Sequence, residues 1–202
     1  MPMDLVGIDK TAEIRIEPDE PMSPGEFFDF CQANSEWQIE RSADGEIIIM
    51  PPAGPESAHY SLDAGANLFI WAKRDRRGRA FDSSAGFTLP NGAVRSPDSS
   101  WVSRERWSRL TSEEKLGFPP VCPEFVIEVK SRTDSLPRLR RKMREWIDNG
   151  ALLGWLIMPE TKTVQIFRPG LPPETREGLR KLAGEGPVDG FTLDLTDIWS
   201  PL

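Results

Sequence analysis

The sequence predicts an α/β (α+β) fold in which helices pack against a mixed β-sheet. Apolar runs at 124–130, 153–158 and 163–168 have the length and composition of buried strands. Helical periodicity runs through 57–73 and 135–149. The order helix, hairpin, helix, strands, helix, strands argues against a helical bundle and against a β-sandwich.

Cap and turn signals place the elements of the N-terminal half. A helix is expected to begin after Ser23, where Glu26 completes a capping box three positions on. Two strands at 37–41 and 46–50 flank a good hairpin turn at 42–45.

Each of the two long helices is expected to bury one apolar side. In the helix at 135–149, which Asn149 and Gly150 end, the apolar residues at helical spacing are Leu136, Leu139, Met143, Trp146 and Ile147. In the helix at 57–73, the apolar side is expected to carry Leu62, Ala66, Phe69 and Ile70.

Composition divides the 202 residues into three parts. Residues 1–21 have little pattern and form an N-terminal leader. Residues 22–170 hold the expected sheet and its helices as one domain. The turn-forming run at 169–173 marks a boundary, after which residues 171–202 form a hairpin-like C-terminal appendage.

The chain is acidic, with a formal net charge of −7 and a sequence pI near 4.9. This argues against non-specific coating of nucleic acid, which needs clustered Lys and Arg. Basic clusters at 73–79 and 138–144 still permit a DNA substrate, and they are equally consistent with solvated helix faces. No run has the length of a membrane span and no signal-peptide core begins the chain, so we expect a cytoplasmic protein without a membrane partner.

Three charged residues lie at the ends of predicted strands. Asp98 belongs to a short strand at 97–102, and Glu128 and Lys130 end the strand at 124–130. Strand side chains alternate between faces, so Glu128 and Lys130 are expected to project together. Buried charge is costly unless it is paired or binds a metal. If Asp98 converges on Glu128 from a neighbouring strand, the two carboxylates can hold a divalent cation.

This pattern suits phosphodiester hydrolysis, in which Mg²⁺ clamps the phosphate and activates water. Asp98 and Glu128 would supply carboxylates, and the carbonyl of Val129 a further oxygen ligand. Lys130 would orient or deprotonate the attacking water, or stabilise the charged transition state. Equally, Glu128 and Lys130 form an exposed ion pair on an edge strand while Asp98 caps a turn, because short motifs of this kind arise by chance.

His59 is the only histidine in the chain. A multi-histidine metal site is therefore excluded, and no partnered Ser or Cys motif indicates a catalytic triad. His59 lies close in sequence to Glu56, but a surface or helix-packing role is the favoured interpretation.

From about Met22 to Gly170 the sequence resembles the PD-(D/E)XK restriction-endonuclease-like superfamily, and most closely the Uma-type restriction endonuclease family. The stretches that carry the resemblance lie in the family's order at 44–54, 86–92, 96–98, 123–130 and 142–154. The resemblance implies a restriction-endonuclease-like mixed sheet flanked by helices, with Asp98, Glu128 and Lys130 in the metal and catalytic positions. Glu56 matches an acid that members often carry at the start of the first long helix, although a helix-dipole acid explains it equally well.

The implied activity is a Mg²⁺-dependent endonuclease acting on DNA, expected to be double-stranded, with Mn²⁺ as a possible substitute. A symmetric duplex is commonly cut by two copies of a site, so we expect a homodimer. Two other interpretations stay open. One is a catalytically silent nucleic-acid-binding or scaffold domain on the same fold, and the other is a metal-dependent hydrolase of another phosphoester.

Overall fold

The computed structural model describes residues 13–200, and its centre is a six-stranded sheet of order β11-β10-β9-β8-β7-β4. β8 and β9 run parallel, whereas the other neighbours in this sheet pair antiparallel. A five-stranded sheet of order β1-β3-β2-β6-β5 and the two-stranded sheet β12-β13 complete the β-structure of the described residues. The predicted α/β fold with a mixed sheet is confirmed.

The strands expected at 37–41, 46–50, 97–102, 124–130, 153–158 and 163–168 are present, with bounds that differ by up to two residues. Their bounds are β1 Ile14–Ile16, β2 Gln38–Arg41, β3 Ile47–Met50, β4 Gly78–Asp82, β5 Phe87–Thr88, β6 Val94–Arg95, β7 Ser99–Ser103, β8 Phe125–Val129, β9 Leu153–Met158, β10 Thr163–Phe167, β11 Glu174–Glu177, β12 Lys181–Ala183 and β13 Thr192–Asp194. The predicted hairpin is present, with Gln38 of β2 opposite Met50 of β3.

The helices include two long ones. Their bounds are α1 Pro24–Ala33, α2 Pro55–Asp75, α3 Arg104–Ser108, α4 Leu136–Asp148 and α5 Thr196–Trp199, with 3-10 turns at Glu114–Leu116, Pro159–Thr161 and Gly186–Val188. The capping box of Ser23 and Glu26 begins α1 as predicted. Within residues 13–200, no helix combines the length and the apolar character needed to cross a membrane.

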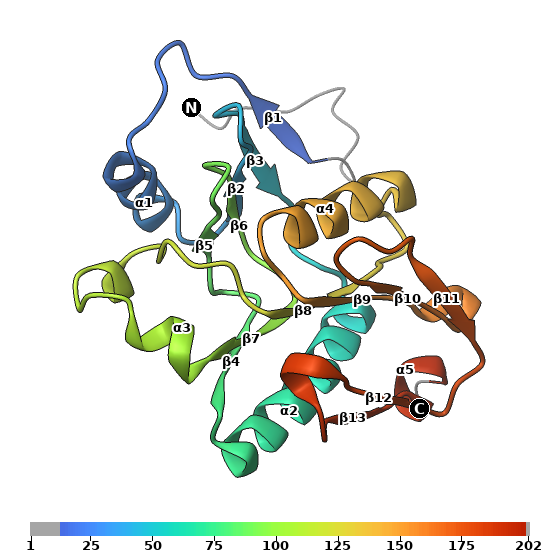
Figure 1. The fold of residues 1–202 in the computed structure, drawn as a ribbon. Coiled ribbons are helices and arrows are strands. Elements are labelled where there is room, and N and C mark those ends of the chain that lie inside the picture. The colour runs from blue at the N-terminus through green and yellow to red at the C-terminus, as the bar shows by residue number, and fades with distance from the viewer. Residues whose placement is uncertain (1–12, 201–202) are drawn as a thin grey trace.

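The two faces of the six-stranded sheet are covered by different helices (Figure 1). α2 packs on one face, where it shares a buried cluster with Phe125 and Ile127 of β8. α4 packs on the other face, where Met143 and Trp146 join Val126. Alternate residues of β8 therefore point into different cores, as the strand period requires.

The buried side of α2 is not the one that the sequence predicted. The structure buries Tyr60, Ala64, Leu68 and Ala72 against the sheet. Leu62, Ala66, Phe69 and Ile70 face solvent, and Leu62 is 69% exposed. Both sets recur at helical spacing, so periodicity alone could not choose between them. Small residues decide the outcome, because a Cβ on Gly65 would lie only 2.8 Å from Ser99 Oγ of β7.

The C-terminal residues share the core of the sheet. Leu182, Phe191 and Leu193 belong to the same buried cluster as the inner side of α2. The division of the chain at residue 170 stays a prediction, as does the leader at 1–21, of which residues 1–12 lie outside the described part.

Candidate functional site

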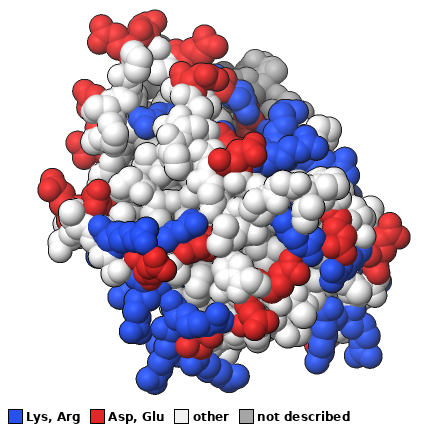
Figure 2. Space-filling view, viewed as in Figure 1, with Lys and Arg blue, Asp and Glu red and all other residues white. Residues whose placement is uncertain are grey.

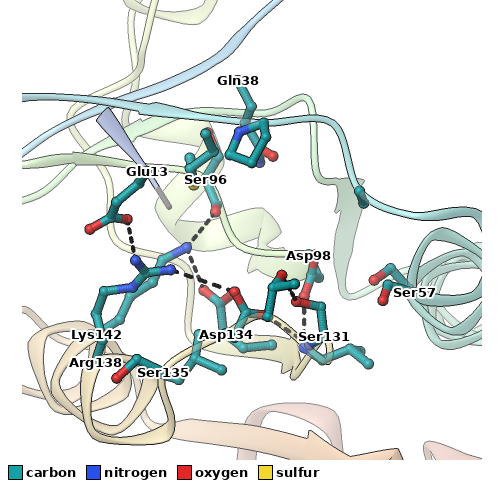
Figure 3. A pocket seen from close by; sticks show the side chains of 18 of the residues that line it. Glu13, Gln38, Ser57, Ser96, Asp98, Ser131, Asp134, Ser135, Arg138 and Lys142 are labelled. Atoms are coloured by element: carbon teal, nitrogen blue, oxygen red, sulfur yellow. Dashed lines mark hydrogen bonds and ion pairs between the residues drawn. The ribbon is translucent and has the colours of Figure 1, made fainter. Parts of the chain in front are cut away.

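A cavity of about 1020 Å³ lies where the two larger sheets meet α4 and the N-terminal end of α2. The titratable side chains that line it include four from separate elements: Glu40 of β2, Asp98 just before β7, Glu128 of β8 and Lys142 of α4. Figure 3 shows Asp98 and Lys142 directed into this space from opposite sides. The predicted convergence of Asp98 and Glu128 on one cavity is therefore observed.

Asp98 is fixed by the end of β8. Its Oδ2 accepts a hydrogen bond of 2.7 Å from the backbone N–H of Val129, the residue after Glu128. Burial raises the pKa of the Asp98 carboxyl, and the Val129 N–H, which favours the charged form, opposes that rise. This hydrogen bond links the residue before β7 to the end of β8, so the two carboxylates are positioned by adjacent strands.

Glu128 is 4% exposed and points toward α4, away from the core that its neighbours Ile127 and Val129 enter. Its Oε1 accepts from Trp146 Nε1 at 3.1 Å and lies 3.0 Å from Lys142 Nζ. Burial raises the pKa of Glu128 to about 7, although the positive charge of Lys142 opposes this rise. A metal ion or a further cation would favour the ionised carboxylate.

Lys142 has an acceptor for each of its three N–H donors. Its Nζ lies 2.9 Å from Glu40 Oε1 and 3.0 Å from Glu128 Oε1, and it donates to the carbonyl of Ser96 at 2.9 Å. Burial alone would lower the pKa of Lys142, but Glu128 and Glu40 together raise it above its ordinary value. Glu128 and Glu40 therefore favour the protonated form of Lys142, in which it can orient and neutralise anions.

Glu40 is the second carboxylate that Lys142 contacts, and it is 3% exposed. Its Oε1 accepts from the backbone N–H of Ser96 at 3.0 Å, and its Oε2 lies 3.0 Å from the Arg95 guanidinium. Burial would raise the pKa of Glu40, but Lys142 and Arg95 outweigh burial and hold it below its ordinary value. Glu40 thus stays ionised and anchors Lys142 from the smaller sheet.

The other predicted site residues lie at different places. Lys130 does not line the cavity; its Nζ donates to the carbonyl of Ser131 at 2.8 Å and lies 3.4 Å from Glu160 Oε2. Glu56 lies at the cavity's rim, where it accepts a hydrogen bond of 2.9 Å from the Tyr60 hydroxyl. His59 is exposed on α2 and is not part of the lining.

Two charged residues of this site, Lys142 and Glu40, were not predicted from the sequence. Only Lys142 lies in a local pattern that could have indicated a buried charge. Lys142 stands on the apolar stripe of α4, beside Met143 and three positions after Leu139, where a charged side chain must be buried with a partner. Glu40 lies between Ile39 and Arg41 in a short strand, and nothing in the local sequence shows that both faces of this strand become covered.

The donor set of the cavity suits a hard divalent cation. Among residues 13–200, no three His, Cys, Asp or Glu side chains are clustered as a complete metal-ligand group. Mg²⁺ does not need such a group, because it is usually held by one or two carboxylates and keeps several waters. Glu128 Oε2 receives no protein hydrogen bond within the described residues, whereas Oε1 holds two. Asp98, Glu128 and the carbonyl of Val129 are oxygen ligands of the type Mg²⁺ prefers.

A mixed sheet with an acidic, lysine-containing cavity at the carboxyl end of its inner strand β8 is the architecture of a restriction-endonuclease-like protein. A family model named Uma2 and described as "Putative restriction endonuclease" matches residues 24–196. The chain therefore belongs to the Uma2 family of putative restriction endonucleases, which confirms the predicted resemblance.

A solved structure supports the assignment of the fold. The crystal structure of a putative nuclease belonging to DUF820 from Anabaena variabilis superposes with a TM-score of 0.70. The match covers 89% of this chain and 98% of that chain, at 23% sequence identity. At this identity the likeness establishes a common fold. No curated protein matches the chain.

Proposed function

We propose that this protein is a metal-dependent endonuclease that hydrolyses phosphodiester bonds of DNA. The observation that carries the proposal is the cavity in which Asp98 and Glu128, from adjacent strands, meet the ammonium group of Lys142. Membership in a family described as putative restriction endonucleases supports the same activity.

Asp98, Glu128 and the carbonyl of Val129 would hold Mg²⁺, for which Mn²⁺ can substitute. When bound, the ion would supply charge stabilisation for the phosphate and an activated water. Lys142 would fix the orientation of Glu128 and place a positive charge beside the reacting phosphate. We assign this role to Lys142 rather than to Lys130, because Lys130 does not line the cavity and its amine contacts the carbonyl of Ser131 and Glu160. Glu56 stays a candidate at the rim, where it could orient a water.

Double-stranded DNA is the proposed substrate, and a homodimer the proposed assembly. Arg132, Arg138 and Arg141 line the cavity and could contact phosphates on either side of the scissile bond. In Figure 3, Arg138 points from α4 toward Glu13, with which it forms an ion pair of 2.7 Å.

The solvent-facing apolar side of α2 offers a surface through which two copies of the chain could associate. The cytoplasmic location expected from the sequence is part of this proposal.

Cleavage of supercoiled plasmid and of duplex oligonucleotides in Mg²⁺ or Mn²⁺ tests the proposed activity. Wild-type protein should cut, EDTA should abolish cutting, and Asp98→Asn and Glu128→Gln should each lower the rate at least ~100-fold. Glu105→Gln, which changes an exposed carboxylate paired with Arg109, is the matched control and should cut normally. Full activity in Glu128→Gln would contradict the proposal. Absence of cleavage by wild type, together with no metal binding in calorimetry, would favour a silent nucleic-acid-binding domain.

A further inference from the structure

A second pocket, far from the carboxylates, is formed at the C-terminal end of α2. It has a volume of about 490 Å³ and is lined by four cationic side chains and no acidic one. We call it the α2–α3 basic pocket, and its lining residues are Arg76, Gly78, Arg79, Arg104, Trp107, Ser108 and Lys115.

Four elements bring these cations together. Arg76 is the C-cap of α2 and has a left-handed backbone with φ 63°, in a region that glycine adopts more readily. Arg79 lies on β4, Arg104 opens α3, and Lys115 belongs to the 3-10 turn that follows. The pocket is thus a product of the tertiary fold and not of one basic run in the sequence.

Contacts to an aromatic ring and to the backbone hold the cations in place. The Arg79 guanidinium and Lys115 Nζ lie 5.5 Å and 5.9 Å from the centre of the Trp107 ring. Arg104 donates to the carbonyl of Arg76 at 3.2 Å, and Lys115 donates to the carbonyl of Leu110 at 2.7 Å. These contacts keep the positive charges close to one another without neutralising any of them.

Two of the nearby acids are engaged with other bases. Asp75 pairs with Arg77, and Glu105 pairs with Arg109. Among residues 13–200, none of the four pocket cations has a carboxylate partner within ion-pair distance. Figure 2 shows Lys and Arg side chains gathered at the lower end of the molecule, where Figure 1 places the C-terminal end of α2. In a chain of net charge −7, four uncompensated cations around one pocket define a local site for an anion.

We propose that the α2–α3 basic pocket binds a phosphate group. Arginine forks and a lysine ammonium are the groups that recognise phosphate oxygens, and guanidinium planes can bind them in bidentate fashion. The phosphate could come from the backbone of a nucleic acid or from a small phosphorylated molecule.

The pocket is separate from the proposed cleavage site. α2 has 21 residues and its first turn borders the cavity of Asp98, so the two sites are ~30 Å apart at 1.5 Å per residue. One phosphate cannot occupy both sites. The inference therefore goes beyond the proposed nuclease activity and does not depend on it.

Binding of sodium pyrophosphate and of a 12-base-pair DNA duplex to the full chain, measured by calorimetry in EDTA, tests the proposal. We expect wild type to bind at least one of the two probes saturably. Arg79→Glu/Arg104→Glu should weaken that binding at least tenfold. The matched control Arg74→Glu reverses a charge at the same end of α2 but outside the pocket, and it should change affinity less than twofold. The milder pair Arg79→Gln/Arg104→Gln should give an intermediate loss, and thermal melts check that every variant is folded.

The two probes separate the sources of the phosphate. Loss of pyrophosphate binding in the double variant would indicate a site for small phosphorylated molecules. Loss of duplex binding alone, with a shallower dependence on salt, would indicate a site for the nucleic-acid backbone. The proposal is overturned if wild type binds neither probe, or if Arg74→Glu weakens binding as much as the pocket variants do. Binding is measured in EDTA and requires no cleavage, so failure of the nuclease proposal would leave this result intact.

Discussion

The ammonium group of Lys142 lies 3.0 Å from the carboxylate of Glu128, and the same group lies 2.9 Å from Glu40. Glu128 belongs to the six-stranded sheet and Glu40 to the smaller one. One lysine of α4 therefore joins carboxylates from two sheets, at the cavity that also contains Asp98. The ion pairs of the site therefore depend on how α4 and the two sheets pack against one another.

Replacing the two candidate lysines should have unequal effects on cleavage. Lys142→Ala should lower the rate of plasmid cleavage at least ~100-fold, because it removes the positive charge beside the reacting phosphate. Lys130→Ala should retain activity within a few fold, since Lys130 does not line the cavity and its amine contacts the carbonyl of Ser131 and Glu160.

The comparison needs a control for folding, because Lys142→Ala leaves the buried Glu128 without its cation and Glu40 with Arg95 alone. Glu40→Gln/Lys142→Gln removes one charge of each sign and should be better folded, yet equally impaired in cleavage. The reverse order, with Lys130→Ala inactive and Lys142→Ala active, would restore the role that the sequence predicted for Lys130.

The metal-free protein should become less stable as the pH rises through the folded-state pKa of Glu128. Burial raises this pKa to about 7, so the folded protein holds the proton more tightly than the unfolded chain does. The contribution of Glu128 is fully present below its ordinary pKa near 4.5 and is lost as the pH rises through about 7. The groups facing it are Lys142, Asp98, Glu40 and the Trp146 indole.

Urea unfolding in EDTA at pH 5 and pH 8 measures this contribution. Asp98 adds a pH dependence of the same sign and Glu40 one of the opposite sign, so wild type must be compared with Glu128→Gln. The fall in unfolding free energy between the two pH values should be smaller in the variant, by on the order of 1–3 kcal/mol. Equal falls in both proteins would show that Glu128 titrates normally.

The sequence was informative where local pattern determines structure. The strand at 125–129 follows from its apolar run, and the helix at 136–148 follows from its helical periodicity and its stop signal. Asp98 and Glu128 could be predicted as site residues because each adjoins a predicted strand. The buried side of α2 could not be chosen, since both of its sides are apolar. Which lysine faces the carboxylates was also undetermined, because it depends on where α4 packs against β8. Glu40 lines the site only because the smaller sheet packs beside the six-stranded one, and this arrangement cannot be read from the local sequence.

Removing Glu40 should destabilise the protein more than removing an exposed acid does. Glu40 is buried between Lys142 and Arg95, and breaking a buried pair typically costs about 3–5 kcal/mol. Glu105 pairs with Arg109 on the surface, where both side chains are more than 70% exposed, at 77% and 72%. Glu105→Ala should therefore cost less than ~1 kcal/mol.

Urea unfolding at pH 7 measures the loss of unfolding free energy in Glu40→Ala and in Glu105→Ala under the same condition. The Glu40→Gln variant keeps the side chain's shape and should fall between Glu40→Ala and wild type. A cost for Glu40→Ala as small as that for Glu105→Ala would mean that water replaces the carboxylate freely, and that Glu40 does not anchor Lys142.

The apolar side of α2 should be the contact between two copies of the chain. Leu62, Phe69 and Ile70 are 69%, 53% and 50% exposed, and Ala66 between them would let two helices approach closely. A self-complementary stripe on one helix suits a two-fold interface, in which each copy presents the same patch. Leu62→Glu/Ile70→Glu should weaken dimerisation at least ~100-fold, because burying each large side chain contributes about 1.5–3 kcal/mol.

Analytical ultracentrifugation over a range of protein concentrations measures the dissociation of the dimer. Leu116→Glu, at an 80% exposed position outside α2, is the control and should leave the mass unchanged. If wild type sediments as a monomer at every concentration, or if the control dissociates equally, this side of α2 does not join two copies.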